Sequence, residues 1–125
     1  MSLQIQSQTS KIDTVHLILD GKLDAITAPE LEKFINDQMN NEIKTLILDL
    51  GNLSFISSAG LRIFAKARKM IKSRSGMVYF TNLSPQVKKV FDIVKAVPLS
   101  EVFQNVGEID AYLEKMQNKV SQENQ

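Results

Sequence analysis

Strand-like and helix-like segments alternate along this chain, and that alternation leaves few folds open. Short apolar runs typical of strands are each followed by a segment with apolar residues three and four positions apart, as in a helix with one buried face. In chain order the segments are 14–19 (strand), 27–39 (helix), 45–50 (strand), 57–75 (helix), 77–81 (strand) and 84–94 (helix). Such alternation predicts parallel strands, because each helix returns the chain to the end of the sheet where the previous strand began.

The edges of the sheet and the last helix are less strongly patterned. Leu3 and Ile5 alternate with glutamines and predict a short antiparallel edge strand, joined to the next strand by a hairpin connection at residues 8–13. A weak strand is expected around residues 101–103, and Asn105 is expected to open a last helix. We therefore predict an α/β domain with a mixed, mostly parallel sheet of about four to five strands and about four helices.

The run Thr45-Leu-Ile-Leu-Asp-Leu is the most apolar strand candidate. It alternates little, which predicts a central strand covered on both faces. Gly51-Asn52 is expected to end this strand, and Asp20-Gly21 is expected to end the strand before it. At the helix starts, Thr27 and Glu30 fit a capping box, and Ser84 precedes a proline as a cap does. Gly76 is expected to end its helix in the left-handed conformation.

Size and composition fit one folded domain that binds something. The chain has 125 residues, a net charge of +1, 43% hydrophobic residues and no cysteine. These values favour a single domain at residues 1–116, with a polar, frayed tail at 117–125, in a reducing compartment such as the cytoplasm. No secretory signal or membrane-length apolar run is visible, and the neutral charge balance gives no reason to expect membrane insertion or nucleic-acid binding.

The segment from Asp49 to Arg62 is the best candidate for a site. It joins a strand to a helix start, where free N–H groups and the helix dipole favour an anion. Its residues Ser57, Ser58, Ala59 and Gly60 are all small, which lets a partner approach the backbone. A purely structural interpretation stays open, in which Ser57 caps the helix and Gly60 packs it on the sheet.

Three motifs in this order resemble the STAS domain of bacterial anti-sigma factor antagonists, over about residues 3–116. The motifs are Gly21-Lys-Leu-Asp24 with Thr27-Ala28, then Ser54-Phe-Ile followed by Ser58-Ala-Gly-Leu61, and Ser84-Pro-Gln-Val87 leading to Phe91. The family's phosphorylated serine falls on Ser58. Ser57 stands where the family has an aspartate, which removes a carboxylate beside the acceptor and makes Ser57 a rival acceptor. Ala59 stands where the family has Ser or Thr.

The resemblance implies a partner-switching protein with no catalytic residues and no cofactor or metal of its own. An anti-sigma factor serine kinase would bind the unmodified protein and then phosphorylate it, and a serine phosphatase of the metal-dependent type would restore it. The expected partner-binding residues are Asp24, Ser57, Ser58, Ala59, Gly60 and Arg62. The helix dipole would tolerate the phosphate, so the fold would survive while the complex is lost.

The sequence also allows other interpretations. The domain could instead be a STAS scaffold or accessory subunit of a transport or signalling assembly, without control of a sigma factor. An enzyme is disfavoured, because Asp24 and Asp49 have no nucleophile or metal ligands beside them. The basic helix from Arg62 to Arg74 is either a solvated face or a surface that steers an acidic partner.

Overall fold

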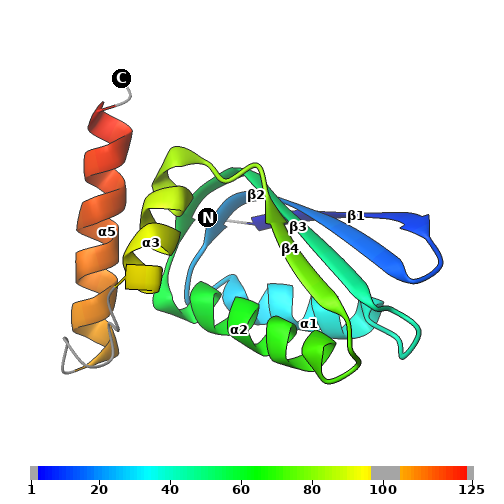
Figure 1. The fold of residues 1–125 in the computed structure, drawn as a ribbon. Coiled ribbons are helices and arrows are strands. Elements are labelled where there is room, and N and C mark those ends of the chain that lie inside the picture. Colours follow the sequence, from blue (N-terminus) through cyan, green and yellow to red (C-terminus); the bar gives the residue numbers. More distant parts are fainter. Residues whose placement is uncertain (1–2, 97–104, 124–125) are drawn as a thin grey trace.

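A computed structural model describes residues 3–96 and 105–123 and has the predicted α/β architecture (Figure 1). The described strands form one mixed sheet in the order β1-β2-β3-β4, with β1 antiparallel to β2 and the remaining neighbours parallel. The strands are β1 (Leu3–Lys11), β2 (Thr14–Leu23), β3 (Thr45–Ile56) and β4 (Met77–Thr81). The helices are α1 (Ala28–Gln38), α2 (Ser58–Lys72), α3 (Pro85–Ala96) and α5 (Val106–Glu123).

The helices α1 and α2 lie side by side on one face of the sheet, while α3 and α5 stand at the end away from the β1–β2 hairpin (Figure 1). In the first half of β3, Leu46, Leu48 and Leu50 are fully buried, but Ile47 and Asp49 between them are only half-buried. The expectation that this strand is covered on both faces is therefore wrong. Ile47 made the run look continuously apolar, although it lies on the less covered face.

Two strands continue past their predicted ends. β2 runs through Gly21 to Leu23, and β3 runs through residues 51–52 to Ile56. Irregularities in the β2–β3 register on both sides of Gly21, which has a φ of 122°, let the two strands stay paired beyond the polar residues. As a result, Leu23 and Ile56 are register partners, and the loops that follow them start together.

The two ends of the chain also differ from expectation. The hairpin connection is only Ile12-Asp13, because β1 extends through the polar residues to Lys11, while β2 begins at Thr14 as predicted. Where the sequence predicts a frayed tail from residue 117, α5 is helical to Glu123, and Gln117 is 2% exposed. Asn105 caps α5 as predicted, with its Oδ1 accepting the Glu108 N–H at 2.9 Å. The strand expected around residues 101–103 lies outside the described residues.

Some of the predicted helix caps form a capping hydrogen bond and others do not. Ser84 Oγ accepts the Val87 N–H at 3.4 Å, as a cap does. Thr27 and Ser57 precede α1 and α2 as predicted, but neither side chain makes a capping hydrogen bond. After α2, Ser75 rather than Gly76 has the left-handed conformation, with a φ of 62°. Among the described residues, no helix combines the length and the apolar character that crossing a membrane requires.

Candidate functional site

The loops that follow the parallel strands meet at one edge of the sheet. The Ser57 N–H donates to the Leu23 carbonyl at 2.9 Å, which holds the start of α2 against the end of β2. Ser84, in the loop after β4, donates its hydroxyl to the Leu53 carbonyl at 2.7 Å. This edge, where parallel strands end and helices begin, is where open α/β sheets bind ligands. The structure thus brings the three sequence motifs together.

Asp24 organises the loop between β2 and α1. Its Oδ1 accepts the N–H groups of Ile26 at 2.9 Å and Thr27 at 3.0 Å, and Thr27 Oγ1 in turn accepts the Asp24 N–H at 2.9 Å. Burial alone would raise the pKa of the Asp24 carboxyl, but the hydrogen bonds from Thr27 and Ile26 outweigh burial and hold that pKa below its ordinary value. Asp24 is therefore a fixed carboxylate beside the start of α2, and the capping partner predicted for α1, Thr27, serves this loop instead.

The two serines at the start of α2 differ in exposure. Ser57 is 6% exposed and has an extended backbone, whereas Ser58, the first residue of the helix, is half-buried. The hydroxyl oxygens of both serines are buried and have no hydrogen-bond partner among the described residues. Neither hydroxyl is thus committed to a structural hydrogen bond, which is unusual for buried polar atoms.

The first amide of α2 is satisfied by a side chain from far along the chain. Asp110 Oδ1, on α5, accepts the Ser58 N–H at 2.8 Å. Gln117, two helical turns further along α5, accepts the Ile56 N–H at 2.9 Å and donates to the Ile56 carbonyl at 2.8 Å. A carboxylate therefore lies beside Ser58 although position 57 lacks one.

The other predicted site residues play different parts. Gly60 is buried, and a Cβ there would lie 2.6 Å from Leu23 Cγ, so this glycine permits the close packing of α2 on the sheet that was predicted. Ala59 is half-buried and packs against the core. Arg62 is exposed one turn beyond Ser58. Of the predicted contact residues, Asp24, Ser58, Ala59 and Arg62 retain accessible surface, whereas Ser57 and Gly60 are buried.

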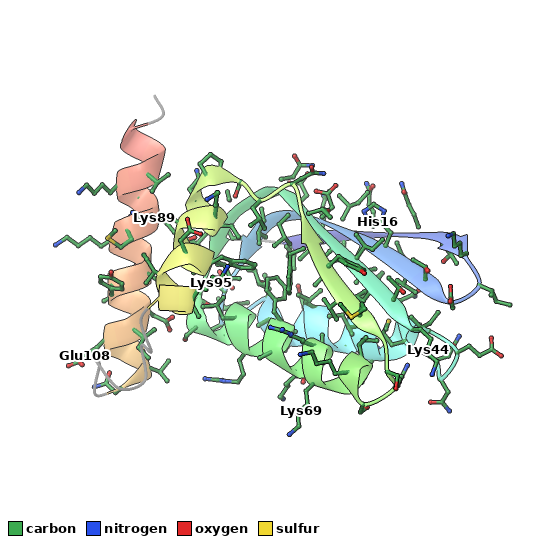
Figure 2. All side chains as sticks on the ribbon, in the orientation of Figure 1. His16, Lys44, Lys69, Lys89, Lys95 and Glu108 are labelled. Atoms are coloured by element: carbon green, nitrogen blue, oxygen red, sulfur yellow. The ribbon has the colours of Figure 1, made fainter. Side chains whose placement is uncertain are left out.

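The basic face of α2 is largely solvated. Lys66 forms an ion pair with Glu32 of α1 at 2.9 Å, and the Lys69 side chain extends away from the sheet (Figure 2). Asp49 accepts hydrogen bonds from the Gly51 N–H and the Asn82 side chain, both at 3.0 Å, so its carboxylate serves the local turn. Within residues 3–96 and 105–123, no three His, Cys, Asp or Glu side chains are grouped as metal ligands would be.

Comparison with known proteins identifies the family. The STAS domain pattern matches residues 6–109, most of the chain. This chain belongs to the STAS domain family. The STAS match ends within α5, one residue before Asp110.

Two relatives of this STAS domain are named as anti-sigma factor antagonists. The anti-sigma-B factor antagonist of Listeria monocytogenes is 26% identical over 110 residues, which are 88% of this chain and 96% of the relative. The putative anti-sigma factor antagonist BtrV of Bordetella bronchiseptica is 35% identical over 75 residues, 60% of this chain and 65% of BtrV.

Solved structures agree with the sequence relatives. The unphosphorylated anti-sigma factor antagonist SpoIIAA superposes with a TM-score of 0.68 at 25% identity, over 76% of this chain and 84% of SpoIIAA. The phosphorylated form of SpoIIAA, from Bacillus, has a TM-score of 0.62 at 24% identity, over 73% and 83% of the two chains. This STAS domain thus belongs with anti-sigma factor antagonists by sequence and by fold.

Sequence reasoning missed Asp110 and Gln117. Both lie on one face of the last helix, on either side of the buried Leu113, at spacings of three and four residues. A polar residue within the apolar stripe of a helix indicates that its side chain makes a specific hydrogen bond. The sequence does not indicate that the partner of Gln117 is the backbone of Ile56, 61 residues away.

Proposed function

We propose that this protein is an anti-sigma factor antagonist that works by binding rather than by catalysis. Its partner is an anti-sigma factor serine kinase, which contacts the loop of Asp24, the start of α2 and Arg62. Phosphorylation of Ser58 by that kinase ends the complex, and a metal-dependent serine phosphatase restores the unmodified protein. The names of its relatives, and the existence of both an unphosphorylated and a phosphorylated form of SpoIIAA, support this proposal.

The observation that carries the proposal is the position of Ser58. It is the first residue of α2, at the edge of the sheet where the loops after the parallel strands meet. Its hydroxyl forms no hydrogen bond with the described residues, so phosphorylation of this oxygen replaces no hydrogen bond that the oxygen itself makes with them. Ser58 is also more exposed than the rival Ser57, which favours Ser58 as the acceptor.

The transfer itself requires little from this protein. Ser58 Oγ attacks the γ-phosphorus of ATP, a new O–P bond forms, the bond to ADP breaks, and the hydroxyl proton passes to a base of the kinase. The product carries about −1.5 to −2 charge where a neutral hydroxyl was. Placed in a packed interface without a matched cation, such a charge costs roughly 2–5 kcal/mol of binding free energy, which lowers affinity by ~30-fold or more.

A labelling experiment with matched serine variants tests the proposal. The cognate kinase and ATP should phosphorylate the wild type and Ser57→Ala, but not Ser58→Ala, with phosphopeptide mapping to identify the residue. Ser54→Ala is a further control, because Ser54 is exposed and donates its hydroxyl to the Gly21 carbonyl at 3.0 Å. A label that maps to Ser57 or Ser54 would contradict the assignment of the acceptor.

Co-purification from the native cell tests the partner. Recovery of a serine kinase with the unmodified protein, and its loss from Ser58→Asp, is the expected result. Recovery of transporter or scaffold subunits, with no kinase that labels the chain, would contradict the proposal and favour the STAS accessory subunit instead.

A further inference from the structure

The last helix is fastened to the segment that carries Ser58 by two polar side chains. Asp110 accepts the Ser58 N–H at 2.8 Å, and Gln117 makes two hydrogen bonds with the backbone of Ile56, at 2.9 and 2.8 Å. Leu113, between them on the same face of the helix, is fully buried. These residues fix α5 directly to the two backbone positions on either side of Ser57.

The contact by Asp110 occupies the place that an anion on Ser58 would use. The first N–H groups of a helix have no partner within the helix and attract negative charge. Since the Ser57 side chain makes no capping hydrogen bond, the Asp110 carboxylate is the anion at this helix start. A second anion on the neighbouring hydroxyl would compete for the same amides and repel the carboxylate.

The hydroxyl of Ser58 is also covered. Its oxygen is buried, although the residue as a whole is half-buried. A kinase must bring the γ-phosphorus within bonding distance of that oxygen, so part of the local structure has to move first. The element that binds the amide of the same residue is α5, which otherwise packs mainly against α3 at the end of the sheet (Figure 1).

We propose that α5 is an autoinhibitory latch on Ser58. In the docked state, Asp110 and Gln117 hold α5 over the start of α2 and restrict access to the hydroxyl. When α5 swings away, Ser58 becomes accessible, and a negative charge on Ser58 keeps α5 released through repulsion of Asp110. The proposal rests on the proposed function in taking Ser58 as the acceptor, and it adds a regulatory role for α5 that the proposed function does not include.

Amide hydrogen exchange on the full-length protein tests the latch without any kinase. Ser58→Asp adds the charge, and Ser58→Asn is the uncharged control of similar size. We expect the α5 amides to exchange about tenfold faster in Ser58→Asp than in Ser58→Asn, which corresponds to about 1.4 kcal/mol. Adding Asp110→Asn to Ser58→Asp should return exchange to the level of Ser58→Asn, because the repulsion is gone. Equal α5 exchange in the two Ser58 variants would overturn the latch.

A second pair of variants distinguishes release of α5 from unfolding of the whole domain. Asp110→Ala leaves both serines in place, and Glu114→Ala alters an exposed residue of the same helix. Only Asp110→Ala should expose the Ser58 amide to exchange, while the amides of Leu48 and Leu50 in β3 stay protected in both variants. Simultaneous loss of protection in β3 and α5 would mean that α5 is part of the cooperative fold, and would overturn the proposal.

A kinase measurement separates the latch from the proposed function. With a kinase that labels the wild type, Asp110→Ala should be phosphorylated about fivefold faster at limiting kinase, and Glu114→Ala at the wild-type rate. An unchanged rate for Asp110→Ala would overturn the control of access. If the kinase of the proposed function labels neither protein, the proposed function fails, whereas the exchange measurements still decide whether α5 is held by Asp110.

Discussion

Replacing Gly60 with alanine measures how tightly the start of α2 is packed on the sheet. A Cβ at this position would lie 2.6 and 2.7 Å from Cγ and Cδ2 of Leu23 and 3.0 Å from Cγ1 of Ile56. Both neighbouring side chains are fully buried, so neither can turn into solvent. Overpacking a core typically costs about 1–3 kcal/mol, and distances below 3.0 Å place this site in the upper half of that range. Alanine returns about 1 kcal/mol of helix propensity, so we expect a net loss of about 1–2 kcal/mol.

Urea unfolding followed by circular dichroism is the assay. For a small domain the free energy of unfolding falls by about 1–3 kcal/mol per molar urea, so the midpoint should drop by about 0.3–2 M with an unchanged slope. Ala65→Gly is the matched control, because Ala65 is exposed in the middle of the same helix. It should lose about 1 kcal/mol through helix propensity alone, which calibrates the gain assumed at position 60.

A double mutant decides whether Leu23 is the obstacle. Leu23→Ala removes the atoms nearest to the added Cβ, so Gly60→Ala should cost less in that background than in the wild type. A Gly60→Ala protein as stable as the wild type, or two substitutions whose effects simply add, would refute the packing argument.

The other predictions concern side chains that hold the loops of the site. Asp24→Asn should remove a stabilisation that exists only while the Asp24 carboxylate is charged. Because the pKa of Asp24 in the folded protein lies below its ordinary value of 3.8, the wild type should be more stable than the variant at pH 7. Acid unfolding curves should show this difference vanish as the pH falls through that lowered pKa. Ser84→Ala should cost about 1–2 kcal/mol in urea unfolding, because its hydroxyl both caps α3 and binds the Leu53 carbonyl, whereas Ser73→Ala, at an exposed serine, should change stability by less than about 0.5 kcal/mol.

Local pattern was sufficient for the elements but not for their ends. The helical spacing in α1 and α2 places Leu31, Ile35 and Ile71 in the core, as the sequence predicts. The polar pairs Asp20-Gly21 and Gly51-Asn52 look like strand ends, yet Asp20 pairs with Asn52 and Gly21 pairs with Leu53, and both strands continue. Each polar pair predicts the end of a strand when the sequence is considered alone. Only the neighbouring strand shows that β2 and β3 stay paired across the irregular positions.

Part of the site was predictable because its residues are close in sequence. The small residues from Ser57 to Gly60 follow a buried strand, and parallel strands end at a common edge, which brings Asp24 beside them. The roles of the polar groups were less predictable. Thr27 and Ser57 have the residue types and positions of helix caps, but Thr27 binds the Asp24 loop and the Ser57 hydroxyl binds none of the described residues.

The sequence by itself determined the fold class, the family and the position of Ser58, because these depend on periodicity and on motifs a few residues long. Only the tertiary structure decided what lies against Ser58. Asp110 and Gln117 are 52 and 61 residues away from the backbone groups that they bind. Their role depends on how α5 docks beside α3, and no local preference of the chain specifies that docking, because it is set by packing between elements distant in the sequence.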